Sequence, residues 1–317
     1  MTPLPSKSFP AFASAIGHAR FVAAYDAVLE DWPVPFEELE VPTLSGVTHV
    51  IASGPLGAPP LILLPSFSGT ATVWRLNMEG LSRHFRCYAV DVIGQPGKST
   101  TPRDALDRQQ FAAWLTRLLD GLAVPRVSLV GCSFGGYLAL SQAALTPDRV
   151  ERVVVISPVG VFQSQFLKLI YAMVIKGTIR KLMRRLTGSR RAPSMADLGI
   201  VPNDEKWGEL MSVTMAEAPR LSKIRPARFR SAEIEAIRTP TLILVGDQER
   251  LYDPQRMLAM AQRLMPHAQG EIVSNADHLA AMAQPAEVNA RITDFLLSSV
   301  HRSTQLRLAT HSVRRQP

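Results

Sequence analysis

Short runs of apolar residues alternate with segments of helical character along most of this chain, and that alternation limits its fold more than any other feature. Several runs contain almost no polar side chains, which is typical of strands buried on both faces of a sheet. Strands are expected at Phe36–Val41, Val47–Ala52, Leu61–Pro65, Cys87–Val92, Val127–Val130, Val153–Ile156, Thr241–Val245 and Glu271–Val273. Helices are expected at 71–84, 107–122, 136–145, 254–265 and 286–297. The alternation predicts a mostly parallel, eight-stranded α/β sheet with helices on both of its faces.

The alternation stops between residues 159 and 238, where the pattern is helical and no clear strand occurs. The sheet pattern resumes at Pro240. We therefore expect residues 159–238 to form a helical cap, inserted into a core made of residues 1–158 and 239–298. Residues 299–317 lack apolar periodicity, so we expect a basic and mobile tail there.

The chain carries a formal net charge of +8, and eight basic residues but no Asp or Glu lie between residues 160 and 191. A basic excess suits nucleic acids, membranes or anionic substrates. No nucleic-acid-binding motif accompanies it, so we expect no nucleic-acid partner. Apolar side chains lie among these charges. Such a segment either contacts a membrane surface or packs its apolar side on the core, and we favour the second interpretation.

The sequence also limits location and metal chemistry. No apolar run reaches the roughly 18 residues that a membrane span needs. Pro10 and Gly17 interrupt the apolar stretch near the N-terminus, unlike a secretory signal, so a cytoplasmic location is expected. Cys87 and Cys132 show neither metal-ligand nor disulfide spacing, and Cys132 is interpreted as a small buried hydrophobe. We expect no bound metal.

Residues 127–136 read Val-Ser-Leu-Val-Gly-Cys-Ser-Phe-Gly-Gly. A Gly-x-Ser-x-Gly motif between a strand and a helix fits a nucleophile elbow, a sharp turn that exposes the hydroxyl of Ser133. The helix N-terminus beside Ser133 favours developing negative charge. Because so short a motif also arises by chance, the chemistry needs partners elsewhere in the chain.

Two later segments supply such partners. Residues 241–249 form an apolar strand followed by a loop with carboxylates, and His278 lies in a loop between a strand and a helix. The order serine, acid, histidine is the order found in α/β hydrolases, whereas other serine hydrolases order the same groups differently. A serine hydroxyl needs such a partner, because it is a poor nucleophile until an imidazole takes its proton.

On these residues the chain resembles the α/β-hydrolase superfamily, nearest to bacterial carboxylesterase-type enzymes. The resemblance covers roughly residues 20–298. It includes residues 48–54, 91–99 and 146–150 besides the serine elbow and the histidine loop. The insertion at 159–238 lies where this superfamily places its cap.

The resemblance implies that Ser133 is the nucleophile and that His278 is the general base and then the general acid. Relatives usually carry Gly-x-x-Asp after the preceding strand, and Glu249 stands at that spacing, so Glu249 is assigned as the acid. Asp247 is the first alternative and Asp253 the second.

The resemblance also implies two backbone donors for an oxyanion, the amides of Phe67 and Phe134. Relatives usually have His-Gly before the first donor, whereas this chain has Pro65-Ser66, and Ser resists backbone angles that Gly adopts. Trp74 and Met282 are expected near the site, which indicates a mainly apolar acyl pocket.

Residues 94–99, Gly-Gln-Pro-Gly-Lys-Ser, resemble the end of a phosphate-binding loop. The full motif needs Gly where Val92 stands, and a helix should follow where Thr100, Thr101 and Pro102 stand. We interpret this segment as structural turns and expect no nucleotide.

These observations predict hydrolysis of a small-molecule carboxylic ester with an apolar acyl part, through an acyl-enzyme and without metal or cofactor. Hydrolysis of a lactone, a thioester or a carbon–carbon bond, acyl transfer, and a non-catalytic ligand receptor are the alternatives, because the same triad and pocket serve each. Haloalkane dehalogenases and epoxide hydrolases would be expected to carry Asp in place of Ser133. The sequence leaves the oligomeric state open.

Overall fold

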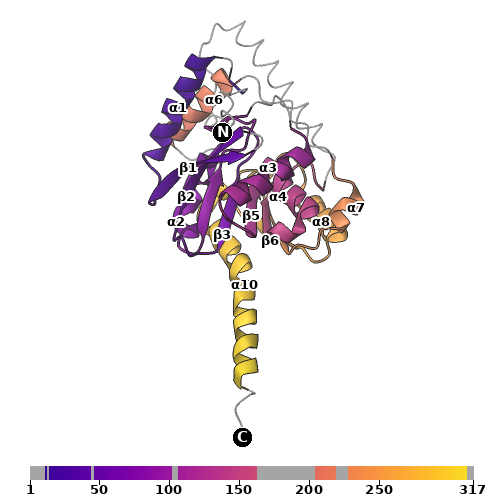
Figure 1. Cartoon of the computed structure of the whole chain (residues 1–317). Helices are drawn as coiled ribbons and strands as arrows, with labels where there is room; N and C mark the ends of the chain where they lie inside the picture. Colours follow the sequence, from indigo (N-terminus) through magenta and orange to yellow (C-terminus); the bar gives the residue numbers. More distant parts are fainter. Residues whose placement is uncertain are drawn as a thin grey trace.

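The computed structural model describes residues 11–312 except 13, 44–45, 102–105, 163–203 and 219–227, with side chains as far as residue 298. Within these residues, eight strands form one sheet in the order β1-β2-β4-β3-β5-β6-β7-β8 (Figure 1). Their bounds are β1 Phe36–Thr43, β2 Gly46–Ser53, β3 Pro60–Leu64, β4 Arg86–Val90, β5 Val127–Cys132, β6 Val150–Ile156, β7 Thr241–Gly246 and β8 Gln269–Val273. The β1–β2 and β2–β4 pairs are antiparallel, and all other neighbours are parallel. The predicted mostly parallel, eight-stranded sheet is confirmed.

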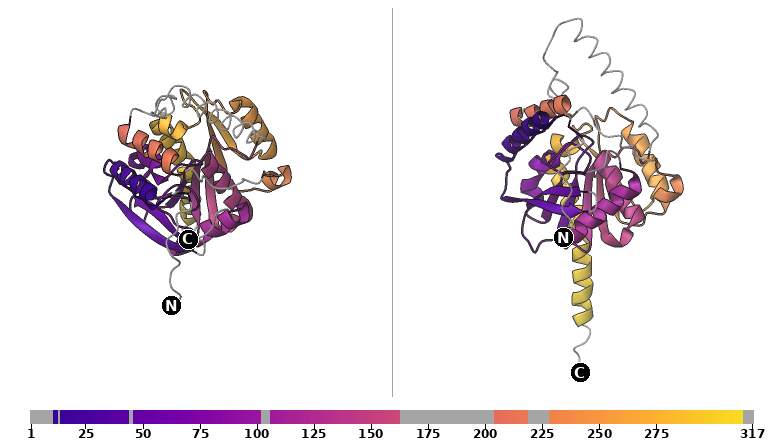
Figure 2. Two further views of the ribbon diagram at one scale, coloured as in Figure 1. Left: turned by 90° about the horizontal axis from the view of Figure 1, so that it is seen from above. Right: turned by 45° about the horizontal axis from the view of Figure 1, so that its top comes forward.

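Helices cover both faces of this sheet (Figure 2). Those described are α1 Ala15–Leu29, α2 Arg75–Leu81, α3 Arg108–Gly121, α4 Phe134–Leu145, α6 Glu205–Glu217, α7 Ser231–Glu235, α8 Pro254–Leu264, α9 Ala280–Ala283 and α10 Pro285–Ser312, with the short 3-10 helices η1 Ala71–Trp74 and η2 Pro147–Arg149. The strands alternate their side chains between two cores, so that Ile62 and Leu64 belong to one cluster and Leu61 and Leu63 to the other.

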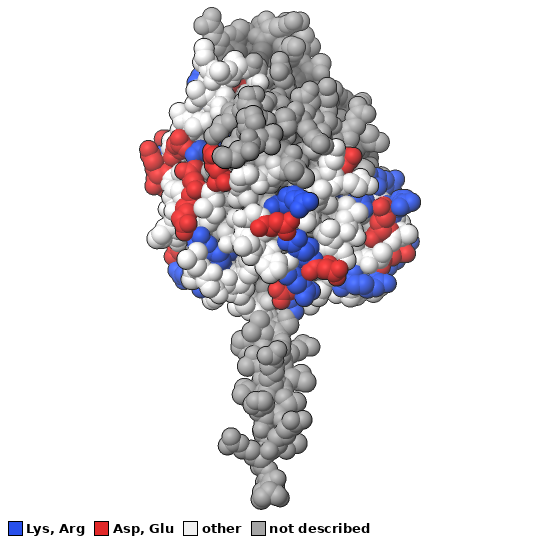
Figure 3. Space-filling model, in the orientation of Figure 1, with Lys and Arg blue, Asp and Glu red and all other residues white. Residues whose placement is uncertain are grey.

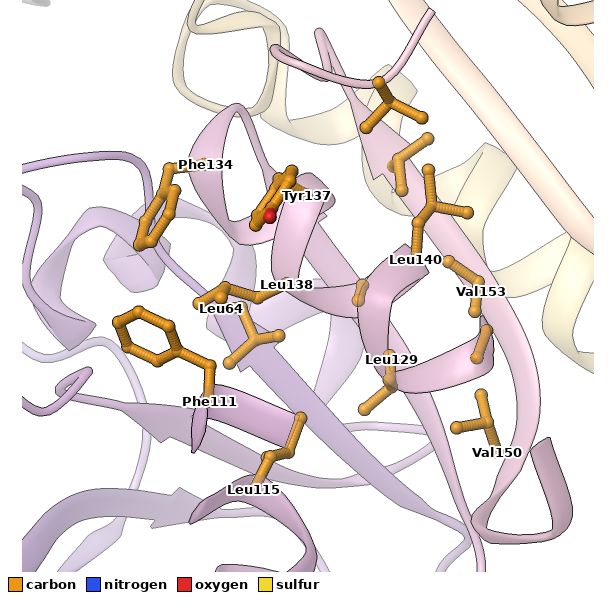
Figure 4. Close-up of a cluster of buried hydrophobic side chains, with 14 of the residues drawn as sticks. Leu64, Phe111, Leu115, Leu129, Phe134, Tyr137, Leu138, Leu140, Val150 and Val153 are labelled. Carbon is orange, nitrogen blue, oxygen red and sulfur yellow. The ribbon is translucent and has the colours of Figure 1, made fainter. Parts of the chain in front are cut away.

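The first core lies between the sheet and α3, α4 and α8. Figure 4 shows part of it around the start of α4, where Phe134, Tyr137 and Leu138 lie close to Phe111 of α3 and Leu64 of β3. The second core receives side chains of α1, α2, α9 and α10. The serine elbow therefore joins a strand and a helix that are both fixed by packing.

Sequence analysis did not identify helix α1, which lies beside α6 of the insertion (Figures 1 and 2). The Ser14 hydroxyl caps its N-terminus by accepting the Gly17 amide at 3.0 Å. Gly17 allows the two helices to approach closely, since a Cβ there would lie 2.5 Å from a carboxylate oxygen of Glu217. Phe21 of α1 and Trp207 of α6 are buried in the same cluster. The N-terminal helix thus packs against the insertion as well as the core.

The described parts of the chain between β6 and β7, where the cap was expected, include α6 and α7. Residues 163–203 and 219–227 lie outside the described residues, and the basic segment 160–191 falls almost wholly among them. Asp204 anchors α6, because it accepts the Trp207 amide at 3.0 Å and also pairs with Arg75 at the start of α2. The limits of the cap stay a prediction.

Helix α10 is longer than expected. It continues to Ser312, so residues 299–312, for which a mobile tail was expected, have helical backbone. The expectation relied on apolar periodicity, which reports a buried face and not helix formation itself. This segment contains no Gly or Pro before Pro317, and its Leu, Ala, Arg and Gln residues favour helix. The second half of α10 extends away from the sheet (Figure 1).

Acidic side chains gather on the side of the molecule formed by α1 and β1 (Figure 3). The acidic residues of these elements and of the turn between them are Asp26, Glu30, Asp31, Glu37, Glu38 and Glu40. The net positive charge of the chain is therefore unevenly distributed. None of the helices in the described ranges is long and apolar enough to cross a bilayer.

Candidate active site

Ser133 occupies a strained turn between β5 and α4. Its φ of 52° and ψ of −109° lie in a region that residues with a side chain rarely adopt. The Ser133 amide donates to the Ile156 carbonyl at 2.8 Å, which ties the turn to the neighbouring strand β6. Gly135 lets α4 approach β3, since a Cβ there would lie 2.2 Å from the Leu64 carbonyl oxygen. This geometry is that of the elbow that the Gly-x-Ser-x-Gly motif predicted.

Glu249 lies in the turn that follows β7. Its amide donates to the Gly246 carbonyl at 3.3 Å, and the Gln248 amide donates to the Ala276 carbonyl at 2.9 Å. This joins the acid loop to the histidine loop. The Glu249 side chain is fully buried, and its Oε1 accepts the Leu251 amide at 2.8 Å. These contacts satisfy oxygens that burial removes from water.

His278 connects these two residues. Its Nδ1 lies 2.6 Å from Glu249 Oε2, and its Nε2 lies 2.9 Å from Ser133 Oγ. An ionised Glu249 only accepts, so Nδ1 carries the proton and Nε2 is left to accept from the serine hydroxyl. The structure therefore brings together Ser133, His278 and Glu249 in the arrangement of a nucleophile, a base and an orienting acid.

The alternative acids serve the surrounding backbone instead of His278. Asp247 accepts the Ala276 amide at 3.1 Å, and Asp253 accepts the Arg256 amide at 2.9 Å as the N-cap of α8. Asp277 accepts the Leu279 amide at 2.9 Å. In the described structure, Glu249 is the carboxylate that contacts the imidazole.

The two expected oxyanion donors lie at the ends of β3 and β5. Phe134 is the first residue of α4, where an amide has no partner within the helix. Phe67 follows β3 in a turn closed by the Gly69 amide, which donates to the Ser66 carbonyl at 2.9 Å. Neither the Phe67 nor the Phe134 amide donates to another residue that the structure describes.

The structure shows how the chain turns at Pro65-Ser66, where relatives usually have His-Gly. The left-handed conformation of this turn falls on Ser68, with a φ of 61°, and not on Ser66. The Ser68 amide donates to Gln95 Oε1 at 3.0 Å. The side chain of Gln95, in the segment that resembled a phosphate-binding loop, thus helps to hold the turn that carries Phe67, and sequence analysis had missed it.

A buried polar network contacts the chain just after this turn. Asp91 accepts the Ala71 amide at 2.7 Å, the Lys98 amide at 2.9 Å and a ring nitrogen of His49 at 3.0 Å. The second ring nitrogen of His49 lies 2.8 Å from Glu38. Burial lowers the pKa of His49, but the hydrogen bonds to Asp91 and Glu38 outweigh it and raise the pKa to about 9. The protonated His49 of β2 therefore links Glu38 of β1 to Asp91, which follows β4 and also accepts the Ala71 amide after β3.

The residues expected to line an acyl pocket are well buried. Trp74 is fully buried and Met282 nearly so, both in the second core cluster. Their role as pocket residues stays a prediction. The ring of Phe67 is half-buried and meets the ring of Phe134 edge-on at 5.8 Å.

Two groups beside the triad are buried and uncharged. Burial, together with the charges of Glu249 and Asp277, raises the pKa of the Cys132 thiol to about 12, which suits the small hydrophobe predicted from sequence. Burial and the Glu249 charge also raise the pKa of Tyr252 well above its usual value. Sequence analysis did not identify Tyr252 as a neighbour of the site. Its position three residues after Glu249 was the signal that could have indicated it. Within the described residues, no group of three or more His, Cys, Asp or Glu side chains could hold a metal ion.

Comparison with known proteins identifies the family. Residues 61–291 match the profile of the "Alpha/beta hydrolase family". Carboxylesterase YbfK of Bacillus subtilis is 35% identical over 303 residues, which cover 91% of this chain and 97% of that protein. The crystal structure of that carboxylesterase (CesB) matches 90% of this chain and 99% of its own, with a TM-score of 0.75 and 32% identity. The crystal structure of naproxen esterase (carboxylesterase NP) of Bacillus subtilis matches 89% and 99%, with a TM-score of 0.77 and 28% identity. This chain therefore belongs to the alpha/beta hydrolase family.

Proposed function

We propose that this protein hydrolyses a carboxylic ester through an acyl-enzyme formed on Ser133. The observation that carries the proposal is the pair of contacts made by His278, 2.9 Å to Ser133 Oγ and 2.6 Å to Glu249 Oε2. The similarity to carboxylesterases of Bacillus subtilis over almost their whole length supports the same reaction type.

The geometry supports a two-step mechanism. His278 Nε2 takes the hydroxyl proton as Ser133 Oγ bonds to the carbonyl carbon, and Glu249 stabilises the imidazolium that forms. The imidazolium then gives this proton to the leaving alcohol as the ester bond breaks. Water, deprotonated by His278, attacks the acyl-enzyme in the same way and releases the acid.

The negative oxygen of each tetrahedral intermediate needs hydrogen-bond donors. The amide of Phe134 lies at the N-terminus of α4, where the helix dipole also favours negative charge. We assign the Phe67 amide as the second donor. Removal of one such donor costs roughly 3 kcal/mol of transition-state stabilisation in enzymes of this type.

We further propose that the acyl part of the substrate is apolar. The ring of Phe67, whose amide is a proposed donor, is half-buried. Trp74 lies in η1, after the loop that carries Phe67, and Met282 lies in α9, after the histidine loop. An apolar pocket would favour longer acyl chains, because each buried methylene contributes about 0.8 kcal/mol.

Nitrophenyl esters of acetate, butyrate and octanoate test this function with wild type, Ser133→Ala and Ser141→Ala. Ser141 is the matched control, since it is a buried serine on α4, the helix that begins after Ser133, and donates to the Tyr137 carbonyl at 2.7 Å. We expect turnover in wild type and Ser141→Ala, with butyrate or octanoate preferred, and none in Ser133→Ala.

Unchanged turnover in Ser133→Ala would contradict the mechanism. A strong preference for acetate would contradict the apolar pocket. Labelling of Ser133 by a fluorophosphonate without turnover of any ester would favour a lactone, a thioester, a carbon–carbon bond or acyl transfer. The absence of both labelling and turnover would favour a ligand receptor.

A further inference from the structure

A continuous set of aromatic rings connects the proposed oxyanion donors to the end of the insertion. The ring of Phe67 meets that of Phe134 edge-on at 5.8 Å. The Phe134 ring lies nearly parallel to Tyr137, 6.0 Å away and inclined by 11°, and Tyr137 meets Phe229 edge-on at 5.4 Å. We call Phe67, Phe134, Tyr137 and Phe229 the aromatic stack.

The middle of the aromatic stack is held on several sides. Phe134 and Tyr137 are each 1% exposed, and Phe111 of α3 meets the Phe134 ring edge-on at 5.8 Å. Figure 4 shows these three rings together at the start of α4. Aromatic pairs in such geometries stabilise each other beyond the effect of the area that they bury. The ring of Phe134 is therefore fixed on the same residue whose amide is a proposed donor.

Phe229 is anchored where the insertion returns to the core. It lies just before α7, and the guanidinium carbon of Arg108 lies 4.2 Å above the centre of its ring. Arg108 also donates to Glu233 of α7 at 3.0 Å. The hydrogen bond from the Arg230 amide, together with the side chains of Arg230 and Arg108, lowers the pKa of Glu233 to about 2. The ion pair between Arg108 and Glu233 therefore persists at neutral pH.

We propose that Phe229 is a positioning residue of the oxyanion hole. Through Tyr137 and Phe134, it fixes the amides of Phe134 and Phe67, so that the seating of the insertion on the core sets how well the site stabilises a transition state. Oxyanion donors act over 2.7–3.1 Å, roughly, and a small displacement weakens the transition state more than the bound ester. The inference rests on the function proposed above for Ser133.

The test compares two phenylalanines that share a setting. Phe229→Leu keeps an apolar side chain but removes the flat ring. Phe295→Leu is the matched control, because Phe295 is buried on α10 with the guanidinium carbon of Arg152 5.2 Å from its ring centre, and it belongs to the other core cluster from the aromatic stack. Arg108→Lys is a second variant, since it keeps a positive charge near Glu233 but removes the planar group over Phe229.

Three measurements separate positioning from general stability. They are kcat and KM for the preferred nitrophenyl ester, the affinity of a trifluoromethyl ketone, and the rate of labelling by a fluorophosphonate. The serine oxygen adds to the ketone carbon, and the resulting oxyanion occupies the proposed hole. We expect Phe229→Leu to lower kcat and ketone affinity about tenfold with KM changed less than about twofold. We expect Arg108→Lys to lower both by a smaller factor and Phe295→Leu to leave both near wild type.

Unchanged kcat and ketone affinity in Phe229→Leu would overturn the proposal, as would equal losses in Phe295→Leu or a loss confined to KM. If Phe229→Leu does not fold, wild-type values in Arg108→Lys would overturn it. If wild type cleaves no ester, the proposed function fails, but the labelling rate still tests the positioning role of Phe229. Slower labelling of Phe229→Leu and not of Phe295→Leu would support the positioning role, and equal rates would overturn it.

Discussion

Both oxygens of the buried Glu249 carboxylate have a donor, since Oε2 lies 2.6 Å from His278 Nδ1 and Oε1 accepts the Leu251 amide at 2.8 Å. The backbone amide two residues further along the chain thus fixes the direction from which the acid approaches the imidazole. A glutamate at this position is longer than the usual aspartate, and the turn after β7 accommodates it.

We predict that Glu249→Gln lowers kcat by about 10³-fold or more, because a neutral amide does not offset the charge of the imidazolium and its NH2 group can favour the wrong imidazole tautomer. Asp247→Asn is the matched control. Its remaining carbonyl oxygen can still accept the Ala276 amide, so we expect less than about a tenfold loss. Steady-state kinetics on the preferred ester decides, and a larger loss in Asp247→Asn would contradict the assignment of Glu249.

Replacement of Gly135 or Gly208 by alanine should have opposite effects on stability. Gly135→Ala places a Cβ 2.2 Å from the Leu64 carbonyl oxygen, so the elbow must shift. We expect a free energy of unfolding about 1–3 kcal/mol lower, together with lost turnover. Gly208 lies within α6 with no atom within 4 Å of an added Cβ, and Gly208→Ala should raise the free energy of unfolding by about 0.5–1 kcal/mol. Urea titration measures both, and equal effects at the two sites would contradict the packing described for the elbow.

The network around His49 predicts a loss of stability in alkali. The pKa of His49 is about 9 in the folded protein, above its ordinary value near 6.5. Its stabilising contribution is therefore full below pH 6.5, roughly, and is lost as the pH rises through about 9. We expect His49→Gln to lower the free energy of unfolding at about pH 6 by 1–3 kcal/mol, and to have a smaller effect at about pH 10.

His267→Gln, at an exposed histidine on the loop before β8, is the control for the alkaline test. Its free energy of unfolding should follow that of wild type at both pH values. Lys98, Asp26 and Tyr25 lie around the same network and are present in each variant, so the difference between wild type and His49→Gln reports His49. A difference that does not fall as the pH rises would contradict the raised pKa.

The parts of the fold that were predictable are those with local signals. Most strands are buried apolar runs, and all eight were identified, although β1 is largely exposed and contains three glutamates. The choice of Ser133, Glu249 and His278 followed from their local motifs and from their order in the chain. Helix α1 had no such signal. Its position depends on contacts with α6, almost two hundred residues away in the chain, such as the ion pair between Arg20 and Glu217 at 2.5 Å.

The choice between Glu249 and Asp247 was not decided by sequence, because it depends on a turn that joins the acid loop to the Ala276 carbonyl. The role of Gln95 was hidden for a similar reason, since its partner Ser68 lies on a different loop. The aromatic stack joins three segments that no sequence spacing relates. Long-range contacts of this kind depend on packing in three dimensions.

Mass spectrometry of the protein after reaction with a fluorophosphonate tests most directly the claim that Ser133 is the nucleophile. We expect a single added phosphonyl group, located on Ser133 by peptide mapping, in wild type and in Cys132→Ala, and no labelling of Ser133→Ala. Labelling of another residue at the wild-type rate in Ser133→Ala, or loss of labelling in a folded Cys132→Ala protein, would contradict this account.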